Sequence, residues 1–222
     1  MLTTLMLALS AIIAYLLGSV NGSIIISRFL FGQDVRRHGS GNAGLTNFYR
    51  IYGVTGAAGV IAIDVLKGVL AAFIGGLLLR LAAPEGFEAE FTDTGRVTAT
   101  FCCILGHSFP IFYGFRGGKG ILTGVSCVFV IDYRAALIAL FIFGVLVAAT
   151  HYVSLGSILS TMSVPVTMVA NGFSTRCILI AAAAVLLIVL RHHENINRLI
   201  HHKESKIVFK KDISHKIDND SF

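Results

Sequence analysis

VTGAAGVIAIDVLKGVLAAFIGGLLLRL, residues 54–81, is a long apolar run that is interrupted only by Asp64, Lys67 and Arg80. An α-helix needs about 20 consecutive, mostly apolar residues to cross the hydrocarbon core of a bilayer. The run exceeds that length, so it predicts a transmembrane helix.

The composition of the whole chain agrees with a membrane location. Hydrophobic residues make up 55% of the 222 residues and charged residues 14%, and the mean hydropathy is +0.79. A soluble domain carries about 25% charged residues, so this chain lacks the charge that a water-facing surface needs. The four cysteines lie inside apolar stretches without the spacing of a zinc site, and we expect them to be packed free thiols.

We expect an all-α, polytopic integral membrane protein with seven transmembrane helices. The apolar runs place the spans at residues 5–30, 54–81, 97–112, 121–131, 135–150, 158–170 and 176–190. Six spans are the alternative, in which the fourth and fifth runs pack as one re-entrant pair. The first charged residue is Arg28, so the N-terminus lacks the basic segment of a signal peptide and is expected to be the first span.

Basic residues gather on one side of the predicted membrane, and that side is expected to be cytoplasmic. Seven spans then put the N-terminus outside and the C-terminus inside. The opposite loops are acidic, with Glu85, Glu88, Glu90, Asp93 and Asp132. Residues 1–204 are expected to form a single transmembrane domain, followed by a polar cytoplasmic tail at 205–222. Twelve of the 18 Lys and Arg residues fall on the basic side: Arg36, Arg37, Arg50, Arg116, Lys119, Arg191, Arg198, Lys203, Lys206, Lys210, Lys211 and Lys216.

Two polar segments on this side have the composition of anion-binding loops. HGSGNAGLTNFYR, residues 38–50, combines small residues, hydroxyl and amide donors, and Arg50, whose guanidinium matches a phosphate. GHSFPIFYGFRGGKG, residues 106–120, ends in a glycine-rich turn with Lys119 before an apolar run. It is not a nucleotide P-loop, because Tyr113 and Gly120 stand where that motif needs Gly and Ser or Thr. The alternatives are a flexible loop with a helix cap and a tight turn with an interfacial lysine.

Two further polar segments and one charged pair are candidates for a functional role. HYVSLGS at 151–157 is short and has no cation. RHHENINR at 191–198 places His192 and Asn195 on one helix face. The paired histidines have no carboxylates in a metal-binding geometry beside them, so no metal site is expected. Asp64 and Lys67 lie three residues apart inside the second predicted span. An ionisable residue there is a functional candidate, but we favour a neutralising pair that fixes helix packing.

The four polar segments together resemble one family, the bacterial acyl-phosphate-dependent glycerol-3-phosphate acyltransferases (PlsY). The Ser-Gly-Asn-x-Gly-x-Thr-Asn pattern of that family stands at residues 40–47, its Gly-His-x-x-Pro and Gly-Gly-Lys-Gly at 106–120, and its His-x-x-Asn-Ile at 192–196. Their order and spacing cover nearly the whole chain. Four positions depart from the usual form: Asn21 in place of Pro, Leu45 in place of Ala, Arg116 in place of Lys, and His202 in place of Gly.

The resemblance implies transfer of an acyl group from acyl phosphate to the 1-hydroxyl of glycerol 3-phosphate. The products are 1-acylglycerol 3-phosphate (lysophosphatidic acid) and phosphate, in the first step of phospholipid synthesis. An acyl phosphate is already activated, so we expect catalysis by positioning and charge stabilisation without a covalent intermediate. The hydroxyl proton goes either to His192 or to a phosphate oxygen of a substrate, and we favour the phosphate.

The resemblance also implies the site and its surroundings. We expect a monomer in the bacterial inner membrane, in contact with lipid, with no cofactor, no metal and no nucleic acid, and with its site on the cytoplasmic face. The expected catalytic residues are Ser40, Lys119, His192 and Asn195. The expected substrate-binding residues are Gly41, Asn42, Thr46, Asn47, Arg50, Gly117, Gly118, Gly120, Ser157 and Glu204.

Two other classes of function are kept as alternatives. A membrane transporter of a phosphorylated solute would also need polar groups, but transporters place their site near the midplane, often between repeats. Here the polar groups collect at one face and no repeat is visible. A non-catalytic membrane assembly protein is the other alternative, and it would not require Lys119.

Overall fold

The structure is a computed structural model that describes residues 1–207, and in this range the chain forms ten α-helices and two 3-10 helices without a strand. The all-α class is therefore confirmed. Most of the predicted tail, 205–222, lies outside the described residues. The elements are α1 (Leu2–Ser19), α2 (Gly22–Phe31), η1 (Val35–Arg37), α3 (Leu45–Tyr52), α4 (Ala57–Leu81), α5 (Glu88–Ser108), η2 (Ile111–Tyr113), α6 (Ile121–Ile131), α7 (Tyr133–Thr150), α8 (Val153–Ala170), α9 (Thr175–Arg191) and α10 (His193–Ile200).

Four stretches of the described chain are long and apolar enough to cross a membrane. They are Leu2–Phe31, Ala57–Leu81, Tyr133–Thr150 and Val153–Ala170. The pair α9 and α10 qualifies as a fifth if its two helices, which bend by 58° at their junction, count as one span. Helix α6 has only 11 residues. The chain is thus a multi-pass membrane protein, while the count of seven spans stays a prediction.

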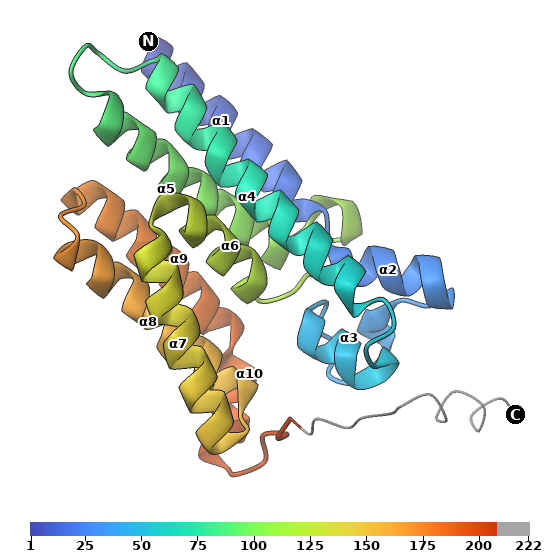
Figure 1. Cartoon of the computed structure of the whole chain (residues 1–222). Helices are drawn as coiled ribbons and strands as arrows, with labels where there is room; N and C mark the ends of the chain where they lie inside the picture. The colour runs from blue at the N-terminus through green and yellow to red at the C-terminus, as the bar shows by residue number, and fades with distance from the viewer. Residues whose placement is uncertain (208–222) are drawn as a thin grey trace, which may run out of the picture.

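The helices pack in two groups with α6 between them (Figure 1). Helices α1, α4 and α5 lie side by side, and α7, α8 and α9 form the second group. Glycines permit close backbone approach in the first group, because a Cβ added at Gly95 would stand 2.2 Å from the carbonyl oxygen of Gly75, and one at Gly106 would stand 2.2 Å from that of Tyr15. Helices α2, α3 and α10 lie at the end away from the N-terminus and the α4–α5 connection (Figure 1).

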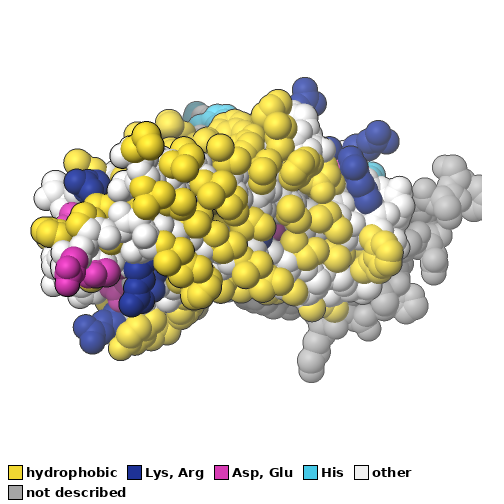
Figure 2. Space-filling view, turned by 90° about the horizontal axis from the view of Figure 1, so that it is seen from above, with side chains coloured by type: hydrophobic (Ala, Val, Ile, Leu, Met, Phe, Trp, Pro, Cys, Tyr) yellow, Lys and Arg dark blue, Asp and Glu magenta, His cyan; other side chains and the backbone are white. Residues whose placement is uncertain are grey.

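The surface between the two ends is apolar. Figure 2 shows hydrophobic side chains over the middle of one face, with most charged side chains toward the two ends. Large side chains such as Phe73, Phe141 and Leu179 are more than half exposed. Such a continuous apolar surface needs contact with lipid.

The predicted first span, 5–30, is not one helix, because the chain is extended at Val20 and Asn21. The side chain of Asn21 caps α2 by accepting a hydrogen bond from the N–H of Ile24 at 3.0 Å. Its amide group also donates to the carbonyl oxygen of Ala43 at 3.0 Å. The capping asparagine thus ends one helix, begins another and ties the break to the first predicted loop.

Two predicted loops are partly helical. Helix α5 begins at Glu88, before the third predicted span at 97–112 and within the acidic stretch that precedes it. Glu88 and Glu90 in its first turn stabilise the positive end of the helix dipole. Helix α8 begins at Val153 and not at 158. Ser157 is therefore held on a helix, which fixes the direction of its side chain more firmly than a loop would.

Asp64 and Lys67 form a buried ion pair, with Nζ of Lys67 2.7 Å from Oδ1 of Asp64. The ammonium group has three N–H donors, and it also contacts the carbonyl oxygen of Val20 at 2.7 Å and Nδ1 of His107 at 2.8 Å. Oδ1 of Asp64 accepts from the N–H of Gly22 at 3.2 Å. The pair therefore joins the break between α1 and α2 to helices α4 and α5, which supports the packing role.

Replacing Lys67 with Met leaves the Asp64 carboxylate buried without its partner, and we expect a loss of about 3–5 kcal/mol in the free energy of unfolding. The double variant Asp64→Asn, Lys67→Met removes both charges and should lose less than the single variant. Thermal unfolding in detergent micelles measures both, with Lys203→Met at an exposed position as the control. Equal losses in the single and double variants would contradict a role for the paired charges.

Candidate active site

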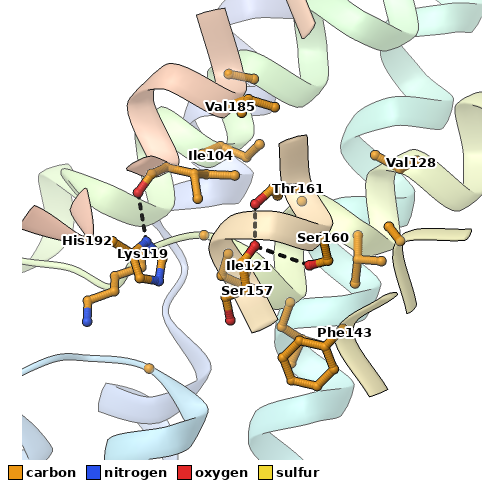
Figure 3. Close-up of a pocket in the computed structure, with 18 of the residues that line it drawn as sticks. Ile104, Lys119, Ile121, Val128, Phe143, Ser157, Ser160, Thr161, Val185 and His192 are labelled. Atoms are coloured by element: carbon orange, nitrogen blue, oxygen red, sulfur yellow. Dashed lines mark hydrogen bonds between the residues drawn. The ribbon is translucent and has the colours of Figure 1, made fainter. Parts of the chain in front are cut away.

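One cavity of about 320 Å³ is lined by residues from all four polar segments. Much of its polar lining comes from the loops and helix ends near α3 and α10. Helices α5 to α9 supply mostly apolar side chains, and the polar residues among them include Thr100, Ser160 and Thr161, with Asp132 between α6 and α7. Figure 3 shows Lys119 and His192 at one side of this cavity, with apolar side chains such as Phe143, Val128 and Val185 around the rest. The cavity can therefore hold a molecule with a polar head and an apolar chain.

Eleven of the predicted site residues line this cavity: Ser40, Asn42, Thr46, Asn47, Arg50, Lys119, Gly120, Ser157, His192, Asn195 and Glu204. The three remaining glycines, Gly41, Gly117 and Gly118, are not part of the lining. The structure thus brings together side chains that are more than 160 residues apart in the sequence.

The first loop is shaped by the side chain of Asn47. Its Oδ1 accepts a hydrogen bond from the N–H of Ser40 at 3.0 Å. Its Nδ2 donates to the carbonyl oxygens of Val35, His38 and Asn42 at 3.3, 3.2 and 3.0 Å. Because these backbone contacts occupy the amide, Asn47 builds the loop that carries Ser40 and Asn42.

The glycine-rich loop packs directly against the end of α5. The N–H of Gly117 donates to the carbonyl oxygen of Ser108 at 3.2 Å, and the N–H of Gly118 donates to that of His107 at 3.0 Å. A Cβ at Gly117 would stand 2.0 Å from the His107 carbonyl oxygen, and one at Gly118 would stand 2.2 Å from Nε2 of His107. These two glycines therefore serve close packing, and their N–H groups are occupied. The N–H groups in the first turn of α6 have no partner within the helix, which makes that turn the better candidate for binding an anion.

Lys119 is the cation at the centre of the polar lining. Its Nζ donates a hydrogen bond to Oδ1 of Asn195. The pKa of Lys119 is lowered to about 8, mainly by burial and also by the positive charge of Arg198, against the opposing effect of Glu204. The ammonium group is thus mostly charged at pH 7 and incompletely neutralised by its surroundings, which suits the binding of a phosphate.

Glu204 holds the residues around Lys119 in place. Its Oε1 accepts hydrogen bonds from Nδ2 of Asn195 at 2.6 Å and from Oγ of Ser154 at 2.8 Å. Its Oε2 accepts from Nε of Arg198 at 2.7 Å. Burial acts to raise the pKa of Glu204, but these three hydrogen bonds outweigh that effect and lower it. Because Nδ2 of Asn195 is held by the carboxylate, Oδ1 of Asn195 is left to face Lys119.

His192 lies at the junction of α9 and α10, with only 3% of its surface exposed. Its Nδ1 is 2.8 Å from the carbonyl oxygen of Ile188, a contact drawn as a dashed line in Figure 3. A carbonyl oxygen can only accept, so Nδ1 carries the proton and Nε2 is left as an acceptor. Burial is the main cause that lowers the pKa of His192 to about 4, with a smaller contribution from the charge of Lys119. The imidazole is therefore neutral at pH 7.

Sequence reasoning assigned no site role to Ser154, Arg198, Asp64 or His107, although all four line the cavity. Arg198 could have been predicted from its spacing, since it lies three residues after Asn195 and so on the same helix face. Ser154 lay in a short polar segment without a Lys or Arg. His107 and Asp64 reach the cavity only because the tertiary packing brings α4 and α5 beneath the glycine-rich loop.

The fold and the site define a helical membrane protein with a cavity whose polar, lysine-bearing end continues into a mostly apolar part. Residues 8–202 match the glycerol-3-phosphate acyltransferase family, and the chain belongs to this family, the PlsY family. It is 38% identical to the glycerol-3-phosphate acyltransferase of Thermoanaerobacter sp. (strain X514), over 92% of this chain and 98% of that relative. It is 36% identical to that of Finegoldia magna (strain ATCC 29328 / DSM 20472 / WAL 2508), over 91% and 97%.

Solved structures of PlsY, an integral membrane glycerol 3-phosphate acyltransferase, have the same fold. The glycerol 3-phosphate form matches with a TM-score of 0.80 and 33% identity, over 91% of this chain and 96% of that chain. The lysophosphatidic acid form matches with a TM-score of 0.78 and 31% identity, over 91% and 95%.

His202, which stands where the family usually has Gly, has a φ of +54°. A side chain in this left-handed region costs about 1–2 kcal/mol relative to Gly. We therefore expect His202→Gly to raise the free energy of unfolding by about 1 kcal/mol, measured by thermal unfolding in detergent. His201→Gly is the matched control, because His201 has a φ of −91° and should gain nothing. No gain for His202→Gly would contradict the strain.

Proposed function

We propose that the protein transfers an acyl group from acyl phosphate to the 1-hydroxyl of glycerol 3-phosphate, giving lysophosphatidic acid and phosphate. The observation that carries this proposal is the single cavity that joins a cationic, hydrogen-bonding end at Lys119 to an apolar lining along α6 to α9. An acyl phosphate has the same division into an anionic head and an apolar chain. The glycerol 3-phosphate and lysophosphatidic acid forms of the PlsY structures support the acceptor and the product.

The proposed reaction is a direct transfer. The 1-hydroxyl oxygen forms a bond to the acyl carbon, and the bond between that carbon and the phosphate oxygen breaks. Lys119 and the N-terminal turn of α6 stabilise the negative charge of the leaving phosphate. Lys119 also binds the phosphate of the acceptor, together with Ser40, Arg50 and Ser157, so that the two reactants are held in a productive orientation.

The hydroxyl proton passes, in this proposal, to an oxygen of the leaving phosphate. His192 presents Nε2 as an acceptor and can hold the hydroxyl. A base with a pKa of about 4 is poorly matched to removing a hydroxyl proton near pH 7. A phosphate group, with its second pKa near 6, is the better acceptor. His192 is therefore assigned to orientation of the acceptor, and the alternative base role is open to test.

We further propose seven spans, formed by α1, α4, α5, α6, α7, α8 and α9. In this arrangement the N-terminus lies outside and the site faces the cytoplasm of a bacterial inner membrane. The excess of Lys and Arg near the helix ends around α3 and α10 supports the orientation. One domain over residues 1–204 acting as a monomer completes the proposal. A transporter of a phosphorylated solute is not favoured, because family members are named as acyltransferases.

Purified protein in detergent should release phosphate from palmitoyl phosphate when glycerol 3-phosphate is present. Acyl-CoA and acyl carrier protein, offered as donors in its place, should give no lysophosphatidic acid. Lys119→Ala should lower kcat/KM by about 100-fold or more, since it removes a charge that faces the leaving group. Lys203→Ala, at an exposed lysine outside the cavity lining, should leave kcat/KM unchanged. Turnover with acyl-CoA but not with acyl phosphate would overturn the assigned donor.

His192→Gln keeps a hydrogen-bonding side chain but removes the imidazole base. If His192 orients the acceptor, the KM for glycerol 3-phosphate should rise by about tenfold, the cost of about one lost hydrogen bond to a substrate, while kcat falls less. Steady-state kinetics with both substrates varied separate the two parameters. A collapse of kcat at unchanged affinity for glycerol 3-phosphate would instead identify His192 as the base.

The affinity for glycerol 3-phosphate should fall as the pH rises through about 8, because Lys119 loses its charge in this range. The phosphate of the ligand is already a dianion there, so its own titration does not contribute. Lys119→Arg should keep its affinity to higher pH, since a guanidinium stays protonated. Isothermal titration calorimetry between pH 6.5 and pH 9.5 measures both proteins. An identical decline in both would show that another group titrates.

A further inference from the structure

Arg36 belongs to the basic residues of the first loop, but its side chain does not line the cavity. Asp34 caps the short helix η1 by accepting a hydrogen bond from the N–H of Arg36 at 3.0 Å. The same carboxylate binds the guanidinium in a two-pronged manner, with Nε 3.0 Å from Oδ1 and Nη2 2.8 Å from Oδ2. The guanidinium plane is thus fixed by its own loop.

The other edge of the guanidinium reaches a segment far along the chain. Nη1 of Arg36 donates to the carbonyl oxygen of Tyr113 at 2.7 Å and to that of Arg116 at 2.9 Å. These carbonyls precede Gly117 and so belong to the segment that leads into Lys119. The guanidinium carbon of Arg36 also lies 6.0 Å from the centre of the Tyr113 ring.

The hydrogen bonds of Arg36 account for four of its five N–H donors, all to protein acceptors. A cation whose donors are used in this way is poorly placed to bind a substrate phosphate, in contrast to Lys119. The hydrogen bond from Arg36 is the main cause that holds the pKa of Asp34 well below its usual range. Arg28 also contacts Oδ2 of Asp34 at 2.8 Å, but its side chain is 53% exposed and contributes less.

We infer that Asp34 and Arg36 are positioning residues, which fix the glycine-rich loop, and with it Lys119, relative to the loop that carries Ser40. The two loops come from different parts of the chain, and each supplies a different part of the polar lining. A displacement of about 1 Å between reacting groups can cost about 100-fold in rate. The structural part of this inference stands on the contacts alone, while its kinetic part rests on the proposed function.

Arg36→Lys is the sharpest test, because a lysine keeps the charge but cannot form the two-pronged contact and reach both carbonyls. Amide hydrogen exchange in residues 109–118 should become about tenfold faster, while peptides from α7 and α8 keep their rates and show that the fold is intact. Turnover with palmitoyl phosphate should fall by about 100-fold in kcat/KM. Asp34→Asn should have the same effects, and the double variant should add little to either single variant.

Arg37→Lys is the matched control, because Arg37 is the neighbouring arginine and is exposed. It should leave the rate of amide hydrogen exchange at 109–118 and kcat/KM within about twofold of the values for the protein without a substitution. Unchanged exchange at 109–118 in Arg36→Lys, or equal changes in Arg37→Lys, would overturn the inference. If the protein without any substitution releases no phosphate, the proposed function fails. The exchange measurement still decides whether Asp34 and Arg36 hold the glycine-rich loop.

Discussion

The site depends first on the buried ammonium group of Lys67. An isolated charge in this part of the molecule would be costly, and the structure satisfies it with three acceptors from three different segments. One of them, the carbonyl oxygen of Val20, is available only because α1 stops there. The break turns α2 away from α1, and the chain after α2 can then form the loop that carries Ser40. Through His107, the same ammonium group supports the helix end against which Gly117 and Gly118 pack. The charge of Lys67, which fixes helix packing, therefore also supports the loop that carries Ser40 and the glycine-rich loop.

The cavity combines two environments that a soluble enzyme would find hard to keep side by side. Its polar end sits at the ends of helices, where unpaired backbone groups and side-chain donors concentrate. Its apolar end is formed by α6 to α9, whose outer surfaces are themselves apolar. Burial at the polar end makes Lys119 easier to deprotonate and keeps His192 neutral. Both effects follow from the burial of these side chains in a poorly solvated pocket. Both determine which charges and hydrogen-bond acceptors an anionic head group meets there.

The sequence was sufficient to predict the all-α membrane class and the convergence of the polar segments, because both follow from composition and from the resemblance. It was not sufficient to predict how each residue is used. The break at Asn21 depends on a cap and on a contact with Ala43, which is 22 residues away. The N–H groups of Gly117 and Gly118 could be assigned to α5 only once the loop was seen against that helix. Ser154 became a member of the site through Glu204, a partner 50 residues away.

The basic residues in and around the site divide according to what their donors contact. Arg36 and Arg198 direct theirs to carbonyl or carboxylate oxygens of the protein, and these contacts hold two loops and one helix in fixed positions. Lys119 has a side-chain amide as its protein partner, which is a weaker acceptor than a carboxylate and leaves its charge for a ligand. The carboxylate of Glu204 is hydrogen-bonded to the other end of that amide, so its negative charge reaches Lys119 only through Asn195. A cation placed directly on the carboxylate would already be neutralised, so the intervening Asn195 is what keeps Lys119 both positioned and able to bind an anion.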